Sequence, residues 1–208
     1  MTGAAVVVPV KSFTEAKGRL AGTVDPARRQ ALSKRMAAGV VAAAAPLPVW
    51  VVCHDHAVAR WAIDVGARVL WRSRSGLNNA VTAAVDALGR MGFDTVIVAH
   101  GDLPLARSLA WVAEADGVTI VPDRRGLGTN VMAVPTGVGF RFAYGEDSAP
   151  LHRAEAERLG LPVRLIDDDA LGWDVDVADD LTVFDDLDVD DPNGDGNGNG
   201  IDGRLDRP

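Results

Sequence analysis

Apolar runs and amphipathic stretches alternate along the chain and predict strands and helices in turn. The short runs are rich in Val and Ile without a polar alternation, which is typical of strands buried on both faces of a parallel sheet. The predicted strands cover residues 4–10, 49–53, 67–71, 95–99, 118–122, 131–135 and 163–166. The predicted helices cover residues 26–45, 56–65, 77–88, 148–159 and 178–187, and another after Asp102 carries Leu109, Trp111 and Val112.

This order of elements predicts an α/β fold. Strands that alternate with helices at this spacing imply right-handed crossovers and a parallel sheet with helices on both faces. After residue 122 glycine-containing loops interrupt the alternation, so the second half should be mixed. With 208 residues, 48% of them hydrophobic, the chain can build one sizeable core. We therefore predict one domain, residues 1–189, with a mixed, mostly parallel sheet.

The last part of the chain differs from the rest in composition. Residues 190–208 are mainly Asp, Asn and Gly and offer no apolar face to bury, which predicts a disordered acidic tail. Their spacing also fits part of a calcium-binding loop. However, Gly198 stands where an apolar residue is usual, and Asp replaces the terminal Glu. Disorder is the interpretation we favour.

Charge and cysteine content narrow the class of partners and the compartment. A net charge of −8 argues against binding a long nucleic acid, because such binding rests on neutralising phosphates with Lys and Arg. The single Cys53 excludes an internal disulfide, and no apolar run is long enough to span a membrane. The first apolar run ends at Val10, too soon for a signal peptide. We expect a cytoplasmic protein without a membrane partner. The oligomeric state stays open, with a homodimer as one alternative.

Carboxylates follow the central strand and precede the last predicted helix. Asp102 comes three residues after strand 95–99, at the carboxyl edge where open α/β sheets bind ligands, and Asp174 and Asp176 precede the helix at 178. Magnesium usually takes one or two carboxylates together with substrate phosphates, so two aspartates meeting at this edge would suit a magnesium–nucleotide complex. The alternative is that each aspartate caps a helix.

A cationic loop follows the first strand. Lys11, Lys17 and Arg19 lie within nine residues, in an otherwise acidic chain, at the usual phosphate-binding station of a nucleotide-binding α/β fold. Lysine can act on a polyphosphate as a point charge and arginine as a bidentate fork. A solvated surface loop is the alternative, since no glycine-rich dinucleotide or Walker pattern occurs.

Several short motifs follow one another in a fixed order between residues 4 and 187. They are Val8-Pro9-Val10-Lys11, Ala16-Lys17-Gly18-Arg19-Leu20, Gly76-Leu77-Asn78, Gly101-Asp102-Leu103-Pro104, Gly128-Thr129-Asn130, Tyr144-Gly145-Glu146-Asp147-Ser148 with His152, and Asp174-Val175-Asp176-Val177-Ala178-Asp179-Asp180-Leu181. Together they resemble the guanylyltransferase family of deazaflavin coenzyme (F-420) biosynthesis, which acts on 2-phospho-L-lactate or phosphoenolpyruvate. The resemblance implies the single-domain nucleotidyltransferase fold of sugar-nucleotide pyrophosphorylases. It also implies that GTP and the phosphorylated acid give a guanylylated acid and pyrophosphate.

The resemblance also assigns roles to individual residues. It implies Mg²⁺ on Asp102 and Asp176, GTP on Lys11, Lys17, Arg19 and Asn78, the acceptor on Thr129, Gly145 and Ser148, and catalytic roles for Lys17 and Asp102. The Val-Pro-Val-Lys opening is more similar to the bacterial than to the archaeal branch, which favours phosphoenolpyruvate. This chain departs from the expected pattern at His100 and Gly101, where small residues are expected.

Other enzyme classes and one non-enzymatic interpretation remain as alternatives. Molybdopterin guanylyltransferases and sugar-phosphate cytidylyltransferases share the fold, but they usually carry a Leu-Ala-Gly-Gly type loop where this chain has Val-Pro-Val-Lys. A metal-dependent glycosyltransferase would use an Asp-x-Asp motif in mid-chain, whereas Asp174-Val175-Asp176 comes near the end. A nucleotide-sensing or calcium-tethered module would depend on the acidic tail.

Overall fold

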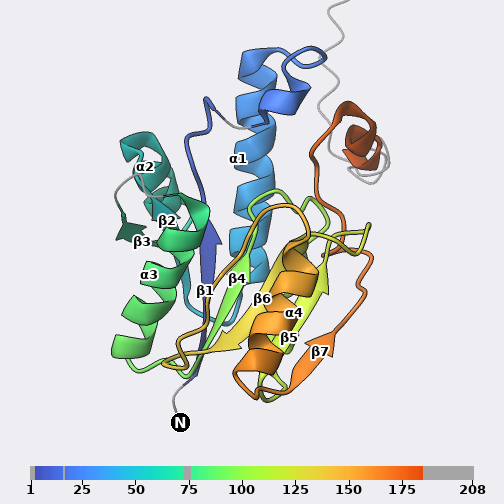
Figure 1. Ribbon diagram of the computed structural model, residues 1–208. Coiled ribbons are helices and arrows are strands. Elements are labelled where there is room, and N and C mark those ends of the chain that lie inside the picture. Colours follow the sequence, from blue (N-terminus) through green and yellow to red (C-terminus); the bar gives the residue numbers. More distant parts are fainter. Residues whose placement is uncertain (1–2, 16, 73–75, 185–208) are drawn as a thin grey trace, which may run out of the picture.

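The computed structural model describes residues 3–15, 17–72 and 76–184. Its strands form one seven-stranded sheet in the order β3-β2-β1-β4-β6-β5-β7 (Figure 1). The strands are β1 (Ala4–Pro9), β2 (Val49–Cys53), β3 (Arg68–Trp71), β4 (Thr95–Ala99), β5 (Val118–Pro122), β6 (Thr129–Pro135) and β7 (Val163–Leu165). The helices are α1 (Pro26–Ala43), α2 (His56–Asp64), α3 (Leu77–Arg90) and α4 (Ser148–Arg158), with short 3-10 helices η1 (Gly18–Leu20), η2 (Ala110–Ala113) and η3 (Ala178–Leu181).

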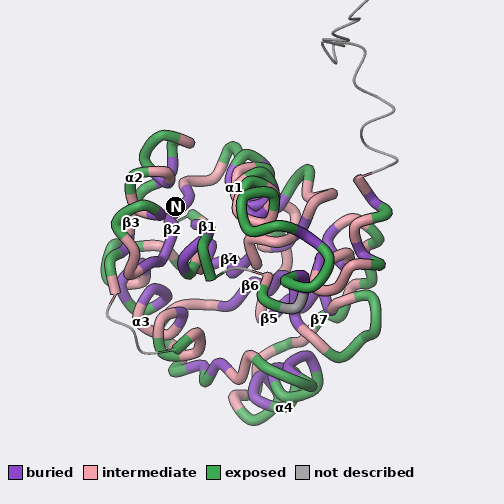
Figure 2. Tube along the Cα trace, turned by 90° about the horizontal axis from the view of Figure 1, so that it is seen from above, coloured by how far each residue is buried: buried purple, intermediate pink, exposed green. Residues whose placement is uncertain are grey.

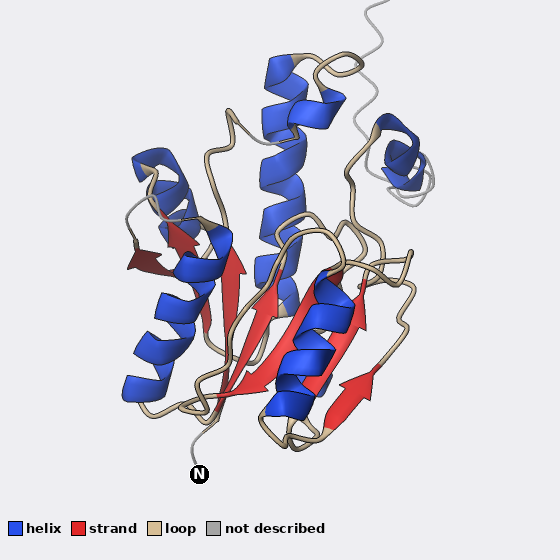
Figure 3. Cartoon of the chain, in the orientation of Figure 1, coloured by secondary structure: helices blue, strands red, loops and turns tan. Residues whose placement is uncertain are grey.

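The sheet is mixed and mostly parallel, as predicted. Strands β3, β2, β1 and β4 pair in parallel, and β7 pairs in parallel with β5. Only β6 runs against its two neighbours, β4 and β5. The carboxyl ends of β1, β2 and β4 therefore meet at one edge, where the loops that carry the predicted site residues gather (Figure 3).

Helices cover both faces of the sheet. Helices α1 and α2 lie on one side and α3 and α4 on the other (Figure 2). The side chains of β1 alternate between these layers, because successive residues of a strand point to opposite faces. Val6 and Val8 belong to the core with Val40 of α1, and Val7 belongs to the core with Val85 of α3. This double burial explains why the strand reads as an unbroken apolar run.

The prediction of a helix directly after Asp102 was wrong. Residues 103–109 form no helix, and the short η2, which carries Trp111 and Val112 but not Leu109, follows them. Leu103 and Leu109 are both fully buried, and the Leu109 N–H donates to the Ala43 carbonyl over 2.9 Å. Packing against the end of α1 thus satisfies this apolar segment without a helix, and Asp102 is not the cap of an α-helix.

The carboxyl-terminal part is described as far as residue 184. The last predicted helix begins at Ala178, as expected, with the 3-10 turn η3. Its predicted end at 187 and the predicted acidic tail 190–208 lie outside the described residues. Within the described part of the chain, no helix combines the length and the apolar character needed to cross a membrane.

Candidate functional site

The ammonium of Lys17 lies between two carboxylates at the carboxyl edge of the sheet. Its Nζ is 2.6 Å from Oδ2 of Asp102 and 3.7 Å from Oδ1 of Asp176. It also donates a hydrogen bond to the carbonyl of Val175. The Lys17 side chain is only 9% exposed. Three segments far apart in the sequence, after β1, after β4 and before η3, therefore meet around one buried positive charge.

Backbone bonds and one buried carboxylate hold the two aspartates in place. The Val175 N–H donates to the carbonyl of Asp102 over 3.2 Å, which ties the two carboxylate-bearing segments together. Asp180 is buried, accepts the N–H groups of Asp176 at 2.6 Å and Val177 at 2.8 Å, and pairs with Arg124. Asp180 therefore caps η3, and the carboxylate of Asp176 lies toward Lys17.

The backbone of Lys17 adopts a left-handed conformation, with φ 56° and ψ 44°. A non-glycine residue in this region costs on the order of 1 kcal/mol and is retained only where its surroundings impose it. Here the two ion pairs and the bond to Val175 are on the side chain, and η1 follows directly. The turn thus serves to point the ammonium at the carboxylates.

The pKa values of two carboxyl groups at the site, those of Asp102 and Asp174, are shifted in opposite directions. Burial alone would raise the pKa of Asp102, but the charges of Lys17 and His100 and the hydrogen bond from Lys17 outweigh it and hold that pKa below its usual range. Asp102 is therefore ionised at neutral pH. Burial and the charges of Asp102 and Asp176 raise the pKa of Asp174. The second carboxylate oxygen of Asp102, Oδ1, is shielded from solvent and has no hydrogen-bond partner among the described residues.

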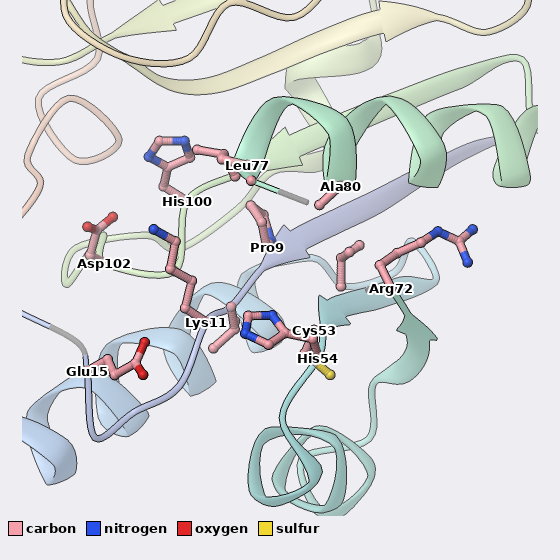
Figure 4. Close-up of a pocket in the computed structure, with 14 residues that line it drawn as sticks. Pro9, Lys11, Glu15, Cys53, His54, Arg72, Leu77, Ala80, His100 and Asp102 are labelled. Atoms are coloured by element: carbon pink, nitrogen blue, oxygen red, sulfur yellow. The ribbon is translucent and has the colours of Figure 1, made fainter. Parts of the chain in front are cut away.

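Two cavities meet at Asp102. The first, the His100 cavity, has a volume of about 390 Å³, and Leu77 and Ala80 are among the residues that line it (Figure 4). Val52 adds a further apolar side chain to its lining. The second, the Lys17 cavity, has a volume of about 350 Å³ and is lined by polar groups that include Lys17 and Asp176. Both share the following lining residues: Pro9, Val10, Lys11, Glu15, Gly101 and Asp102. An elongated ligand with an apolar and an anionic end could lie across the two.

Comparison with protein families places this chain in a known group. The family model described as "Guanylyl transferase CofC like" matches residues 4–184. The chain belongs to this family. The resemblance inferred from the ordered motifs is thus confirmed, and so is the predicted nucleotidyltransferase activity as a class. This finding favours the CofC-like family over the glycosyltransferase and the sensing-module interpretations.

Individual relatives of this CofC-like chain carry two related names. Phosphoenolpyruvate guanylyltransferase of Chloroflexus aggregans is 36% identical over 193 residues, which cover 86% of this chain and 95% of that protein. The 2-phospho-L-lactate guanylyltransferase of Methanothermobacter thermautotrophicus is 35% identical over 185 residues, which cover 84% of this chain and 81% of that protein. Relatives of both names therefore match most of the chain.

A solved structure confirms the predicted fold type. A putative nucleotide-diphospho-sugar transferase from Desulfovibrio desulfuricans superimposes with a TM-score of 0.73 at 17% identity, over 92% of this chain and 90% of that one. At this identity the likeness concerns the fold alone. The predicted nucleotidyltransferase fold of the CofC-like chain is confirmed.

The residues predicted to bind GTP lie in different surroundings. Lys11 lines both cavities, and its side chain points toward the end where His100 and Asp102 lie (Figure 4). Lys17 lines the Lys17 cavity. The side chain of Arg19 lies outside the described part. Asn78 clamps the backbone of Tyr144: its Oδ1 accepts the Tyr144 N–H at 2.7 Å and its Nδ2 donates to the Tyr144 carbonyl at 3.3 Å.

The residues predicted to bind the acceptor line neither cavity. Thr129 and Ser148 are buried, and Oγ1 of Thr129 lies 3.0 Å from Nδ1 of His152. Gly145 is exposed and has a φ of 148°, which favours glycine. A Cβ there would meet no described atom within 4 Å, so backbone conformation rather than crowding by the protein favours glycine. Their role toward the acceptor stays a prediction.

His152 is a structural centre that the sequence did not reveal. It is fully buried, and its Nε2 accepts the Ala143 N–H at 2.9 Å. Its ring also packs edge-on against Tyr144, with the centroids 4.8 Å apart. The sequence predicts only that His152 belongs to the helix 148–159, because nothing local indicates which groups the fold brings to a buried ring.

Acid should destabilise the folded protein through His152. Burial, assisted by the charge of His100, lowers the pKa of His152 to about 4 from 6.5. Below pH 6.5 the unfolded chain therefore binds a proton that the folded chain rejects, and stability falls as the pH falls. We expect a loss of about 2 kcal/mol between pH 7.5 and pH 5 from this residue. Urea titrations of the wild type and of His152→Gln at both pH values measure it. An equal loss of stability in the wild type and in His152→Gln would show that His152 is not the cause.

Proposed function

We propose that this chain transfers GMP from GTP to phosphoenolpyruvate, or to 2-phospho-L-lactate, and releases pyrophosphate, in biosynthesis of the coenzyme F-420. The supporting observation is the meeting of Lys17, Asp102 and Asp176 between two joined cavities, in a chain of the guanylyl transferase family. Both acceptors are taken from the names of its relatives, which are phosphoenolpyruvate and 2-phospho-L-lactate guanylyltransferases.

GTP would lie across the two cavities. The His100 cavity, with the apolar side chains of Val52, Leu77 and Ala80 in its lining, suits a nucleoside. The polar Lys17 cavity suits the triphosphate, because Lys11 and Lys17 can neutralise its charge there. The reacting α-phosphorus would then lie near Asp102, where the cavities meet.

The two carboxylates fit a magnesium site. Oδ1 of Asp102 is buried without a hydrogen-bond partner in the described part of the chain, and an unpaired ionised oxygen calls for a cation. No group of three or more His, Cys, Asp or Glu suited to a metal occurs among the described residues. Magnesium, however, usually takes one or two carboxylates and completes its shell with phosphates and water. Asp102 and Asp176 would hold the ion, which would neutralise charge on the phosphates.

The reaction follows from these placements. A phosphate oxygen of the acceptor attacks the α-phosphorus, the bond from that phosphorus to the bridging oxygen of the β-phosphate breaks, and pyrophosphate leaves. The attacking oxygen is already ionised at neutral pH, so no general base is required. Catalysis rests on positioning and on the charges of Lys11 and Lys17, which oppose the repulsion between two anions.

The acceptor would bind beside the start of β6, which carries Thr129, and beside Gly145 and the start of α4, which carries Ser148. Because Nε2 of His152 accepts the Ala143 N–H, the neutral ring carries its hydrogen on Nδ1 and donates it to Thr129. The hydrogen of the Thr129 hydroxyl can then be donated to another group. We place phosphoenolpyruvate first, because the opening motif is of the bacterial type.

The test is pyrophosphate release by the purified chain. GTP, ATP, CTP and UTP are each offered with phosphoenolpyruvate and with 2-phospho-L-lactate, in the presence of magnesium. We expect turnover with GTP and phosphoenolpyruvate that exceeds every other pair. Turnover with ATP, CTP or UTP that exceeds turnover with GTP, or none with GTP and either acid, would overturn the proposal.

A further inference from the structure

His100 carries a buried nitrogen that nothing in the described structure satisfies. The residue follows β4 directly, and its backbone N–H donates to the carbonyl of Asn130 over 3.0 Å. Its ring lines the His100 cavity beside Asp102 (Figure 4). The ring atom Nε2 is shielded from solvent and has no hydrogen-bond partner among the described residues. Buried polar atoms are almost always paired, so an unpaired nitrogen on a ring that lines a cavity points to a ligand.

The ring is held in this orientation by neighbours that are themselves fixed. It packs against Tyr144, with the ring centroids 5.1 Å apart. Tyr144 is held on one side by the double hydrogen bond of Asn78 to its backbone and on the other by the ring of His152. A side chain placed by such packing is suited to orient a substrate.

The position of His100 indicates which part of the reaction it faces. His100 lines one cavity and Lys17 the other, and the two cavities meet at Asp102. If the pyrophosphate leaves on the side of Lys17, in-line displacement requires the attacking oxygen to approach from another side of the phosphorus. His100 lies outside the Lys17 cavity, against Tyr144, the neighbour of Gly145 in the chain.

We propose that His100 binds the acceptor: its Nε2–H donates a hydrogen bond to an anionic oxygen of the phosphorylated acid and positions that acid for attack. This inference rests on the proposed function and adds to it a residue that the family resemblance did not assign. A phosphate or a carboxylate oxygen of the acceptor would serve equally, because an N–H on Nε2 can be donated to either.

The experiment compares His100→Leu with His100→Gln, which keeps an N–H donor. Initial rates of pyrophosphate release are measured with GTP and the acid varied separately. We expect His100→Leu to raise the KM for the acid about tenfold or more, as for a lost hydrogen bond to an anion, and to change the KM for GTP much less. His100→Gln should restore much of the loss. His56→Leu is the control, because this ring stacks on Trp71 and does not line the cavity.

Two further measurements separate acceptor binding by His100 from a purely structural role. A merely structural His100 would show up as a lowered melting temperature in His100→Leu, whereas removing an unpaired buried nitrogen should leave it unchanged or raise it. A raised KM for GTP alone, or unchanged kinetics in His100→Leu, would overturn the inference. If the wild type turns over no pair of GTP and acid, the proposed function fails first. Binding of phosphoenolpyruvate alone, followed by calorimetry in both proteins, then tests His100 independently, and equal affinities would overturn its role.

Discussion

The Asp102→Asn enzyme is expected to lose at least about two orders of magnitude in kcat while keeping its fold. The substitution removes the negative charge that Lys17 contacts at 2.6 Å and the buried oxygen that we assign to magnesium. Losing one group that stabilises charge in a transition state typically costs a factor of about a hundred to a thousand. Because the amide has nearly the same volume, the core around Leu103 need not repack. Asp176→Asn should act in the same direction.

Single-turnover and steady-state assays of pyrophosphate release measure this loss, with melting curves to show that the fold is intact. Asp86→Asn is the matched control, because this aspartate is exposed in the middle of α3 and lines neither cavity. It makes the same change of charge elsewhere in the chain. Activity near the wild-type level in both Asp102→Asn and Asp176→Asn would exclude the assignment of these carboxylates to the metal.

Local sequence patterns were sufficient to predict elements whose form depends on their own residues alone. Strand β4 occupies 95–99, as predicted, because an apolar run buried on both faces needs no information beyond its own sequence. Asp25 starts α1, as its place before Pro26 predicts, and its Oδ1 accepts the N–H groups of Ala27 and Arg28 at 3.0 Å. For residues 103–109 the local pattern was misleading, because contact with the end of α1 determines the path of this segment.

The candidate site could be predicted only in part for a related reason. The place of Asp102 at the edge of the sheet follows from strand order, and its helix-cap alternative is excluded by the structure. The contact of Lys17 with Asp102 joins residues 85 positions apart, and Asp176 lies farther still along the chain, so no local pattern encodes these contacts. The use of Asp180 rather than Asp176 as a cap likewise depends on Arg124, which lies in another loop.

The Lys17→Met enzyme is expected to need much more GTP. The ammonium of Lys17 is nearly enclosed, and the same group that now contacts Asp102, Asp176 and Val175 would bind the triphosphate in the Lys17 cavity. A hydrogen bond to a charged partner contributes about 1.5–3 kcal/mol, so kcat/KM for GTP should fall by roughly ten- to a hundredfold or more. Methionine keeps the length of the side chain and removes only the charge and the donors.

Kinetics with GTP varied at saturating acceptor measure this effect, and Lys34→Met provides the control. Lys34 lies on α1 and lines neither cavity, and its ammonium is 5.6 Å from the centre of the Phe13 ring at the Lys17 cavity. Its loss makes the same change in net charge without removing a side chain that lines either cavity. Lys17→Arg gives a second comparison, because it keeps the charge but replaces a point charge by a planar fork. If the triphosphate needs only the charge, Lys17→Arg recovers most of the GTP dependence; if it needs the compact ammonium between the two carboxylates, Lys17→Arg behaves like Lys17→Met. An unchanged GTP dependence in Lys17→Met would contradict this role of Lys17 and would favour the alternative that the cationic loop after β1 is a solvated surface loop.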